Sequence, residues 1–396
     1  MIPRYVGMDL HKNYVMVAAV DAEQEVVLQP LRVEMAQLAD WAAGHLTEED
    51  QVVLEATSNA WPVVDLLRRD AGEVRVANPY KTKLIAEARI KNDKVDALAL
   101  AQLLAARFVC DVWVPDEQVR EQRALAAHQA TLQRQCTRVK NRTHAVLRRH
   151  NLRCPEKSLF STAGLEWLHS LPLPLVDALQ IRHLLDQLAH LQVQREETDR
   201  LIARQASSDP RVPVLMQLTG IGYFSAFAIL ALIGNIHRFP SPQKLSAYAG
   251  LVPSQHQSGQ HSFQGHITKQ GPSMFRWLLV EAARSAIRWD PHWQQVHQRI
   301  ALRRGSNVAT VAVARKLLVT IWHLLSDATP YYYLRPQSFV TKLQEWAYRI
   351  GRSHLSAPSA KAFVSAHLRA LYLNHLADSL TTNGRTSRLL VHPAQL

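Results

Sequence analysis

The sequence predicts a mixed α/β domain followed by a mainly helical region, and three observations support this division. The first 115 residues alternate short β-branched apolar runs with helical patterns. In the rest of the chain, apolar residues recur at helical spacing. Residues 1–115 contain 12 Lys and Arg against 17 Asp and Glu, a net charge of −5, and the remainder carries +18. The pattern and the charge change together, so we place a domain boundary near residue 115.

The first domain is expected to contain five strands. Three apolar runs come first and are separated by polar residues, which predicts a three-strand meander. The predicted elements are strands at 4–10, 14–21 and 25–34, a helix at 35–46, a strand at 51–56, a helix at 61–69, a strand at 73–78 and a helix after residue 79. This order predicts a mixed sheet covered by helices, as in the ribonuclease H topology.

Composition indicates a cytoplasmic protein that binds an anionic polymer. The chain has 396 residues, 47% of them hydrophobic, which suffices for two or three domains with buried cores. Its 46 Lys and Arg exceed its 33 Asp and Glu, so nucleic acid is the leading partner. Three cysteines without a CxxC pair argue for a reducing compartment and against structural zinc. The N-terminus lacks an apolar signal core and the apolar run 224–234 is too short for a bilayer, so we expect no membrane partner.

Four carboxylates of the first domain are candidate metal ligands. Asp9 lies in the first predicted strand, on the face opposite its apolar neighbours, and Glu55 ends the fourth strand. Asp93 and Asp96, in the stretch IKNDKVDA, are three residues apart on the following helix and project from one face. An exposed helix face of alternating charge also explains that stretch. If the four carboxylates cluster, their repulsion requires a counter-ion, and oxygen ligands suit Mg²⁺ or Mn²⁺.

Residues 116–205 are expected to form a long helical hairpin or coiled coil. Two stripes of apolar residues recur near heptad spacing, and basic residues follow another face of the first helix. The two stripes are Leu125, Leu132, Val139 and Val146, then Ile181, Leu184, Leu188, Leu191 and Ile202; the basic residues are Arg134, Arg138 and Arg142. An intramolecular helix pair and self-association through these helices both fit the pattern. The arginines are candidate nucleic-acid contacts.

The next region contains a break between two apolar helices at the residues TGIG, 219–222. This break resembles the turn of a helix-hairpin-helix module, in which glycines let backbone N–H groups at a helix start approach phosphate. Gly220 and Gly222 are therefore candidate phosphate contacts. A tight turn within an ordinary helical bundle explains the glycines as well.

Residues 248–271 are predicted to form a polar loop, rich in Ser, Gln, His and Gly and too long to be a mere connector. The loop holds three serines, Ser254, Ser258 and Ser262. It leads into an apolar helix, with Lys269 before the helix and Arg276 near its start. Any of the serines could cap or hydrogen-bond the loop, and no Ser-His-Asp order separates them.

The order of three short motifs, GMDLHK, LEATSN and KNDKVDA, resembles the DEDD signature of a family of bacterial insertion-sequence transposases. That family also contains the Piv-type DNA invertases and recombinases guided by a bridge RNA. The resemblance covers roughly residues 4–330. It implies a RuvC-like domain in which Asp9, Glu55, Asp93 and Asp96 bind the metal and take part in catalysis.

A second signature of the family places a serine and a glycine ahead of a basic residue, a glycine and an arginine. The resemblance implies that Ser258 is the nucleophile, and the rest of the signature then corresponds to Gly259, Lys269, Gly271 and Arg276. Relatives place basic residues soon after the serine and glycine, whereas this chain has Gln260 and His261. The sequence therefore leaves open which group activates Ser258.

Together these features predict four segments. They are a RuvC-like DEDD metal-binding domain at 1–115, a helical coiled-coil linker at 116–205, a mostly helical transposase domain with the catalytic serine at 206–330, and a basic helical extension at 331–396. The extension carries 8 Lys and Arg against 2 Asp and Glu, and it either braces the serine domain or contacts nucleic acid.

The resemblance implies a DNA transposase or site-specific recombinase that works through a covalent phosphoserine intermediate. Its partners would be donor and target DNA, a structured noncoding RNA, and further copies of the chain in a dimer or tetramer. Two other functions fit parts of the sequence. A RuvC-like nuclease or junction resolvase needs the four carboxylates but no serine, and a non-catalytic nucleic-acid scaffold needs neither.

Overall fold

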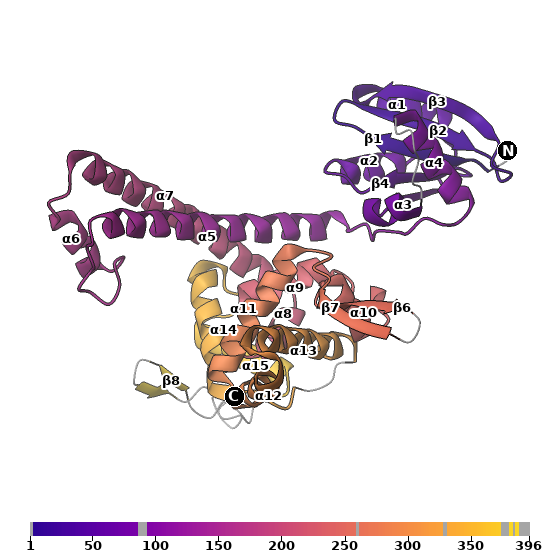
Figure 1. Ribbon diagram of the computed structural model, residues 1–396. Helices are drawn as coiled ribbons and strands as arrows, with labels where there is room; N and C mark the ends of the chain where they lie inside the picture. The colour runs from indigo at the N-terminus through magenta and orange to yellow at the C-terminus, as the bar shows by residue number, and fades with distance from the viewer. Residues whose placement is uncertain are drawn as a thin grey trace. The chain divides into compact units, whose positions relative to one another are not determined.

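The computed structural model describes residues 3–85, 93–258, 261–327, 331–373, 380–382 and 385–387. The chain divides into two units, Met1–Asp116 and Glu117–Leu396, which we describe separately (Figure 1). The first unit combines a sheet with helices, and the second is mainly helical. The predicted mixed α/β domain followed by a helical region is therefore confirmed.

The first unit contains a five-stranded mixed sheet in the order β3-β2-β1-β4-β5. Its strands are β1 (Tyr5–Leu10), β2 (Tyr14–Val20), β3 (Val26–Glu34), β4 (Gln51–Glu55) and β5 (Glu73–Ala77). The first three strands are antiparallel neighbours, whereas β4 pairs in parallel with both β1 and β5. This is the predicted topology, with β1 at the centre of the sheet.

Helices cover both faces of this sheet because alternate side chains of its strands point to opposite faces. A 3₁₀ turn (Met35–Gln37) leads into α1 (Leu38–His45), and α1 and α2 (Ala60–Leu67) share one apolar core with β1 residues such as Met8. On the other face, α4 (Asp93–Ala105) packs against the sheet through Ala97, Leu100 and Leu104. A further helix, α3 (Pro79–Ile85), follows β5.

Gly7 allows α4 to lie directly on β1. A Cβ atom at this position would lie 2.0 Å from the Ala97 carbonyl oxygen and 2.5 Å from the Ala101 amide nitrogen. Both are backbone atoms, so a side chain at position 7 would force the helix away from the strand. The contact fixes the height of α4 over the sheet, and therefore the position of the carboxylates in its first turn.

The second unit begins with a helical hairpin formed by α5 (Glu117–Arg149) and α7 (Leu175–Ala206), with α6 (Thr162–Ser170) between them (Figure 1). The predicted stripes largely meet each other: Leu132 and Val139 of α5 are buried with Leu184, Leu188 and Leu191 of α7. The apolar pattern is thus satisfied by an intramolecular pair. Self-association through these helices stays a prediction.

A bundle of helices completes the second unit. It comprises α8 (Arg211–Met216), α9 (Tyr223–Ile233), α10 (Pro242–Tyr248), α11 (Ser273–Trp289), α12 (Pro291–Arg304), α13 (Ser306–Ser326), α14 (Pro336–Ile350) and α15 (Ala360–Ala370), with 3₁₀ turns at Ile236–Arg238 and Arg352–His354 and a strand pair, β8 (Leu380–Thr382) and β9 (Arg385–Ser387). One apolar core includes residues from α8 to α15. The segments predicted at 206–330 and 331–396 therefore share a core.

One helix among the described residues, α13, is long and apolar enough to cross a membrane by length and composition alone. It is longer than the apolar run 224–234, which lies mostly in α9. Val313, Leu317 and Ile321 of α13 are fully buried in the core of the second unit. Packing within the bundle therefore accounts for the apolar side chains on the buried face of α13.

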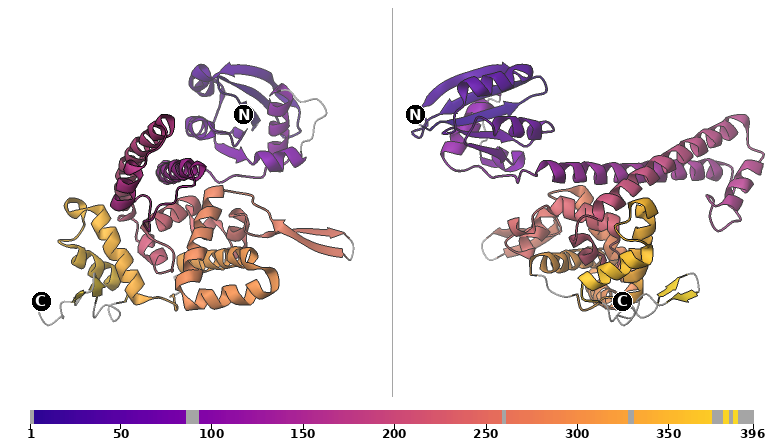
Figure 2. Two further views of the ribbon diagram at one scale, coloured as in Figure 1. Left: turned by 60° about the vertical axis from the view of Figure 1, so that its left-hand side comes forward. Right: turned by 180° about the vertical axis from the view of Figure 1, so that it is seen from behind.

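The polar segment predicted as a loop is instead a β-hairpin for most of its length. β6 (Pro253–Ser258) and β7 (His261–Ile267) are antiparallel and project from the helical bundle (Figure 2). Their sequences carry polar residues on both faces, so the apolar alternation that marks a half-buried strand is missing. The loop prediction was wrong because the sequence of this hairpin lacks the alternation that identifies a strand.

The contact at Gly7 can be tested by substitution. Gly7→Ala should destabilise the first unit by about 1–3 kcal/mol, because the added methyl group overpacks the interface with α4. Amide hydrogen exchange in the peptides that cover β1 and α4 would measure the loss. Gly44→Ala is the matched control: no atom lies within 4 Å of its added Cβ, and alanine favours the α1 helix. Equal protection in the two variants would contradict the proposed close packing.

Candidate active site

Asp9 and Asp93 come together with His11 on the face of the sheet that α4 covers. His11 Nε2 lies 3.0 Å from Asp9 Oδ2 and 3.2 Å from Asp93 Oδ2. One ligand atom from each of the three residues lies within 4.8 Å of the others. Asp9 is largely buried, with 19% of its side chain exposed, whereas Asp93 is 44% exposed. The cluster is therefore partly open to solvent.

The other two predicted carboxylates lie in neighbouring positions. β1 and β4 are parallel with Met8 opposite Leu54, so Asp9 and Glu55 are the next residues on adjacent strands and project to the same face. Asp96 lies one turn after Asp93 in α4, and its charge acts on Asp9. The structure thus places all four predicted residues at one end of the sheet.

The pKa of Asp9 is shifted by burial and by the charged groups around it. Burial raises the pKa of Asp9, and the charges of Asp96 and Asp93 raise it further. His11 opposes this effect through its hydrogen bond and its positive character. A buried carboxylate with two acidic neighbours is stabilised in its ionised form by a cation, so the geometry favours cation binding.

His11 and Tyr14 belong to the cluster but were missed in the sequence. The His11 ring stacks on Tyr14 with centroids 4.5 Å apart, and the Tyr14 hydroxyl donates to Asp93 Oδ2 at 2.8 Å. This hydrogen bond to a carboxylate raises the pKa of Tyr14. The Asn59 side chain donates to the His11 carbonyl oxygen at 3.1 Å and so holds the loop after β1. The available signal was the spacing of His11 two residues after Asp9.

The residues present fit a hard divalent cation. Mg²⁺ and Mn²⁺ prefer carboxylate oxygens, and Asp9, Asp93, Asp96 and Glu55 supply them. A protonated His11 between Asp9 and Asp93 would supply positive charge at the same position. The ligand set therefore suits Mg²⁺ or Mn²⁺, with His11 close enough to a bound ion to influence it.

The predicted nucleophile lies in the second unit, at the end of β6. The Ser258 backbone pairs with His261 of β7, and the intervening Gly259 and Gln260 lie outside the described residues. Ser262 pairs with Gln257, one position further from the hairpin end, and Ser254 is partly buried near the start of β6. Among the three serines, Ser258 is thus adjacent to the end of a projecting hairpin.

The predicted basic framework after the serine holds the base of this hairpin. Arg276 Nη1 donates to the carbonyl oxygens of Gln270 and Gly271, each at 3.1 Å, and of Ala249 at 3.3 Å. Lys269 is exposed, and its backbone N–H donates to the Gly250 carbonyl oxygen at 3.2 Å. Arg276 therefore has a structural role at the start of α11, while the Lys269 side chain stays available for a nucleic-acid contact.

The two glycines of the predicted helix-hairpin-helix turn have different environments. Gly220 has φ +90°, and an added Cβ would lie 2.3 Å from the Ala282 carbonyl oxygen of α11, so packing alone requires glycine. Gly222 is the N-cap of α9, and no atom lies within 4 Å of its added Cβ. The backbone at Gly222 is therefore open to a ligand, whereas α11 covers the backbone at Gly220.

A buried lysine from the C-terminal segment stabilises the same turn. Lys342 of α14 donates to the carbonyl oxygens of Met216, Leu218 and Ile221, the last two at 2.9 and 3.0 Å. Burial lowers the pKa of Lys342 to about 7. Three acceptors match the three N–H groups of an ammonium. Residues 331–373 thus brace the preceding helices, one of the two roles expected for this segment.

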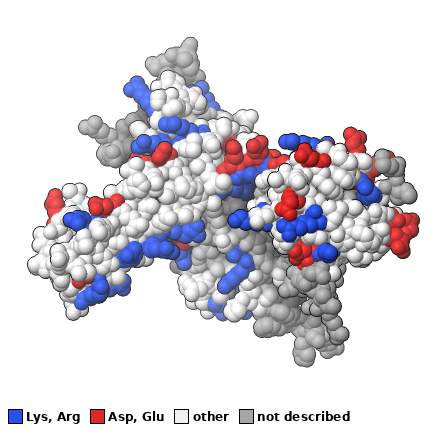
Figure 3. Space-filling model, turned by 90° about the horizontal axis from the view of Figure 1, so that it is seen from above, with Lys and Arg blue, Asp and Glu red and all other residues white. Residues whose placement is uncertain are grey.

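The three predicted arginines of the hairpin, Arg134, Arg138 and Arg142, are all exposed on α5. The helix carries eight Lys and Arg against two Asp and Glu, whereas α7 carries four against five. Figure 3 shows Lys and Arg side chains recurring along the hairpin. Positive charge on the hairpin is therefore concentrated on α5, where it can attract phosphate.

Two models of protein families match this chain. The model of the DEDD transposases of IS110 matches residues 6–152, and the model of the IS116/IS110/IS902 transposase family matches residues 212–298. The first match contains all four clustered carboxylates, and the second contains the β6–β7 hairpin.

Three curated relatives match along most of their length. A probable family 20 transposase of Pseudomonas aeruginosa is 29% identical, over 82% of this chain and 98% of the relative. The transposase for insertion sequence element IS1111A of Coxiella burnetii is 27% identical, over 83% and 91%. The transposase for insertion sequence element IS1328 of Yersinia enterocolitica is 25% identical, over 82% and 97%.

The carboxylate cluster predicts that Asp9→Asn stabilises the fold at neutral pH when a chelator is present. Because folding raises the pKa of Asp9 from 3.8, the protonated side chain contributes to the stability of the folded protein at low pH. This contribution is lost as the pH rises from 3.8 through the folded-state pKa. At pH 7 with a chelator, Asp9→Asn should therefore raise the free energy of unfolding, and the gain should shrink as pH falls. Thermal unfolding at several pH values would measure it.

The control for this experiment is Asp40→Asn, which removes the same charge from the exposed first turn of α1. That substitution should leave stability unchanged or slightly lower, because an acidic residue near a helix N-terminus is favourable. A wild-type protein that is more stable than Asp9→Asn in chelator at pH 7 would show that His11 already compensates the cluster.

Proposed function

We propose that this chain, which belongs to the IS110/IS116/IS902 family of DEDD transposases, recombines DNA through a phosphoserine intermediate on Ser258. Transposases are enzymes that cleave and rejoin DNA, and DEDD transposases typically use a divalent metal. The observation that carries the proposal is the convergence of Asp9, Asp93 and Asp96 at the end of the sheet, with Glu55 on the adjacent strand.

The carboxylates act as metal ligands in this proposal. Asp9 and Glu55 extend from adjacent strands, and Asp93 and Asp96 extend from α4, so the four can hold Mg²⁺ or Mn²⁺. A bound divalent ion would neutralise charge that develops on the transferring phosphate. Tyr14 holds Asp93 by a hydrogen bond, and the sheet holds Asp9, so both carboxylates are oriented before DNA arrives.

Ser258 supplies the covalent step. Its Oγ forms a bond to a DNA phosphorus while the bond from that phosphorus to a deoxyribose oxygen breaks. The serine hydroxyl loses its proton, and the leaving deoxyribose oxygen gains one, so the step needs no oxidant or other co-reactant. A second DNA hydroxyl then reverses the exchange on the new strand. The placement of Ser258 beside the end of a projecting hairpin supports this role, because the hairpin can reach DNA.

The partners follow from charge and from the family. Donor and target DNA and a structured noncoding RNA encoded beside the gene would bind basic surfaces, among which α5 is prominent. The chain would act in the cytoplasm as a dimer or tetramer, with the carboxylates of one protomer serving the serine of another. Exposed apolar residues of α7, such as Leu175 and Val176, support an interface between copies.

A second candidate function uses the carboxylates alone. A RuvC-like nuclease or junction resolvase would hydrolyse DNA at the same cluster and would not need Ser258. The two functions differ in one product. A recombinase leaves a protein–DNA adduct that resists denaturation, whereas a nuclease leaves hydrolysed ends and no adduct.

The metal role predicts that Asp9→Asn and Asp96→Asn each reduce DNA cleavage by at least roughly a hundredfold, because the lost charge weakens cation binding. Fold and nucleic-acid binding should be retained, as circular dichroism and filter binding would show. Asp40→Asn should cleave like the wild type. Full recombination by either cluster variant would show that these carboxylates are structural.

The serine role predicts that Ser258→Ala eliminates both recombination and the covalent adduct. Ser254→Ala and Ser262→Ala should retain activity, because a serine that only hydrogen-bonds contributes about 1 kcal/mol to stability. The assay would combine DNA carrying the element ends with RNA transcribed from the sequence beside the gene, followed by a denaturing gel. Strand joining by Ser258→Ala, or an adduct mapped to Ser254 or Ser262 by mass spectrometry, would reject the assignment.

A further inference from the structure

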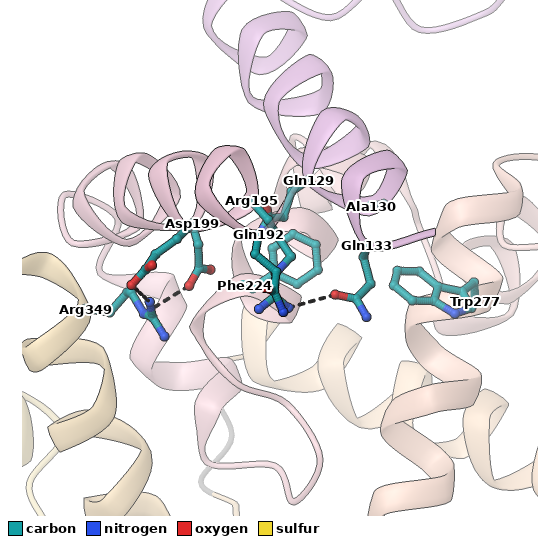
Figure 4. Close-up of a pocket in the computed structure, with 10 residues that line it drawn as sticks. Gln129, Ala130, Gln133, Gln192, Arg195, Asp199, Phe224, Trp277 and Arg349 are labelled. Atoms are coloured by element: carbon teal, nitrogen blue, oxygen red, sulfur yellow. Dashed lines mark hydrogen bonds and ion pairs between the residues drawn. The ribbon is translucent and has the colours of Figure 1, made fainter. Parts of the chain in front are cut away.

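The second unit contains a pocket of about 660 Å³ between the base of the helical hairpin and the helical bundle (Figure 4). Its walls come from α5, α7, α9, α11 and α14. The volume lies within the range of small-molecule sites, roughly 300–1,000 Å³. Neither the carboxylate cluster nor the β6–β7 hairpin contributes to it.

Two aromatic side chains line this pocket. Trp277 of α11 is 41% exposed, and Phe224 of α9 is partly buried against the core. Trp277 therefore presents part of its indole to the pocket, where a flat ligand can contact it. Flat aromatic faces of this kind bind other flat rings by stacking, and nucleobases are the flat rings that a nucleic-acid enzyme meets.

The polar side chains of the pocket include an unused hydrogen-bond acceptor. Gln129 of α5 is 8% exposed, and its Oε1 has no hydrogen-bond partner among the described residues. A buried acceptor without a partner costs free energy. Rotation of this amide would present the oxygen to the pocket, where an N–H group of a base could donate to it. The amino and imino groups of nucleobases are such donors.

The charges of the pocket leave one cation without an acidic partner. Arg349 forms ion pairs with Asp199 at 3.0 Å and Glu196 at 3.4 Å, and Glu196 also pairs with Arg200 at 3.1 Å, so two cations and two carboxylates compensate one another. Arg195 Nη1 instead donates to the neutral Gln133 Oε1 at 2.9 Å, and no described carboxylate lies within 4.0 Å of its guanidinium (Figure 4). Arg195 can therefore attract phosphate or stack on a base.

The pocket also adjoins the turn predicted to contact phosphate. Phe224 follows the α9 N-cap, Gly222, by two residues, and the space beside Gly222 is open. The first turn of α9 offers backbone N–H groups that lack partners within the helix. A nucleotide whose base lies in the pocket could thus place its phosphate toward the start of α9 or toward Arg195.

We propose that this pocket binds one unpaired nucleobase of a nucleic-acid strand, stacked on Trp277 and Phe224 and hydrogen-bonded to Gln129. The proposal deepens the function proposed above and rests on it, because it assumes that the chain handles unpaired DNA or RNA. The ligand chemistry is the same in both polymers: a flat heterocycle that carries an N–H donor and is linked to phosphate. A displaced DNA strand and a guide RNA are its two possible sources.

The test uses full-length protein and two oligonucleotides of one sequence, a single-stranded DNA and the matching RNA, each carrying one 5-iodouracil. Irradiation joins 5-iodouracil to an aromatic side chain on which it stacks, and mass spectrometry identifies the residue. We expect adducts on Trp277 or Phe224. Whether the DNA, the RNA or both form these adducts identifies the strand that supplies the base. Adducts confined to residues outside the pocket would reject the proposal.

Binding affinity supplies the second readout. Trp277→Ala should weaken binding of the preferred oligonucleotide roughly tenfold, because stacking on one aromatic side chain contributes about that factor. Trp277→Phe should restore most of it, and Gln129→Leu should weaken binding without changing the fold. Trp289→Ala is the matched control, since Trp289 lies on the same helix, is 58% exposed and is absent from the pocket.

The outcomes separate the two proposals. If Trp277→Ala binds as tightly as Trp289→Ala, or if an abasic strand binds the wild type as tightly as an intact one, the base pocket is rejected. The transposase proposal is then unaffected, since it is measured by strand joining. If the wild type binds neither oligonucleotide, both the pocket and nucleic-acid handling by this unit are rejected.

Discussion

The contact between the backbone of α4 and Gly7 of β1 is the constraint on which the candidate site depends. Because residue 7 has no side chain, the helix lies at backbone distance from the strand, and its first turn carries Asp93 and Asp96 to Asp9 two residues further along β1. The cost is that Asp9 is buried beside other acidic groups: burial raises its pKa, and the charges of Asp96 and Asp93 raise it further. His11 and Tyr14 offset part of that cost, and a divalent cation would offset the rest.

Much of the first unit could be predicted because its strands are either buried on both faces or separated from the next strand by polar residues typical of a turn. The alternation in β1 separates Met8 from Asp9, and the three-residue spacing of Asp93 and Asp96 is the period of one helix face. The spacing of His11 two residues after Asp9 could have placed these two side chains together, but the contact of His11 with Asp93 arises only when α4 packs on the sheet. No pattern along the chain reports such a contact between distant segments.

The second unit was harder to predict where polar residues form regular structure. The β6–β7 hairpin lacks a regular alternation of apolar and polar residues, so it resembles a loop in sequence. The apolar residues of α13 recur without a polar break, and their place in the core follows only from the packed bundle. The heptad pattern of α5 and α7 did identify the hairpin, but it could not show that the stripes meet within one chain. Lys342 is similar: a single lysine in an amphipathic helix gives no sign that it holds a turn more than a hundred residues earlier.

The two units also separate the proposed chemistry. The proposed metal ligands lie in one unit, and the proposed nucleophile and base pocket lie in the other. The central claim is that the first of these units holds a divalent cation between Asp9 and Asp93. Anomalous X-ray scattering from crystals of the protein grown with Mn²⁺ tests this most directly. The account predicts an anomalous peak within ligand distance of the Asp9 and Asp93 carboxylates, with Asp96 or Glu55 completing the shell. A site with His11 still bridging the two aspartates, and manganese bound elsewhere or not at all, would contradict it.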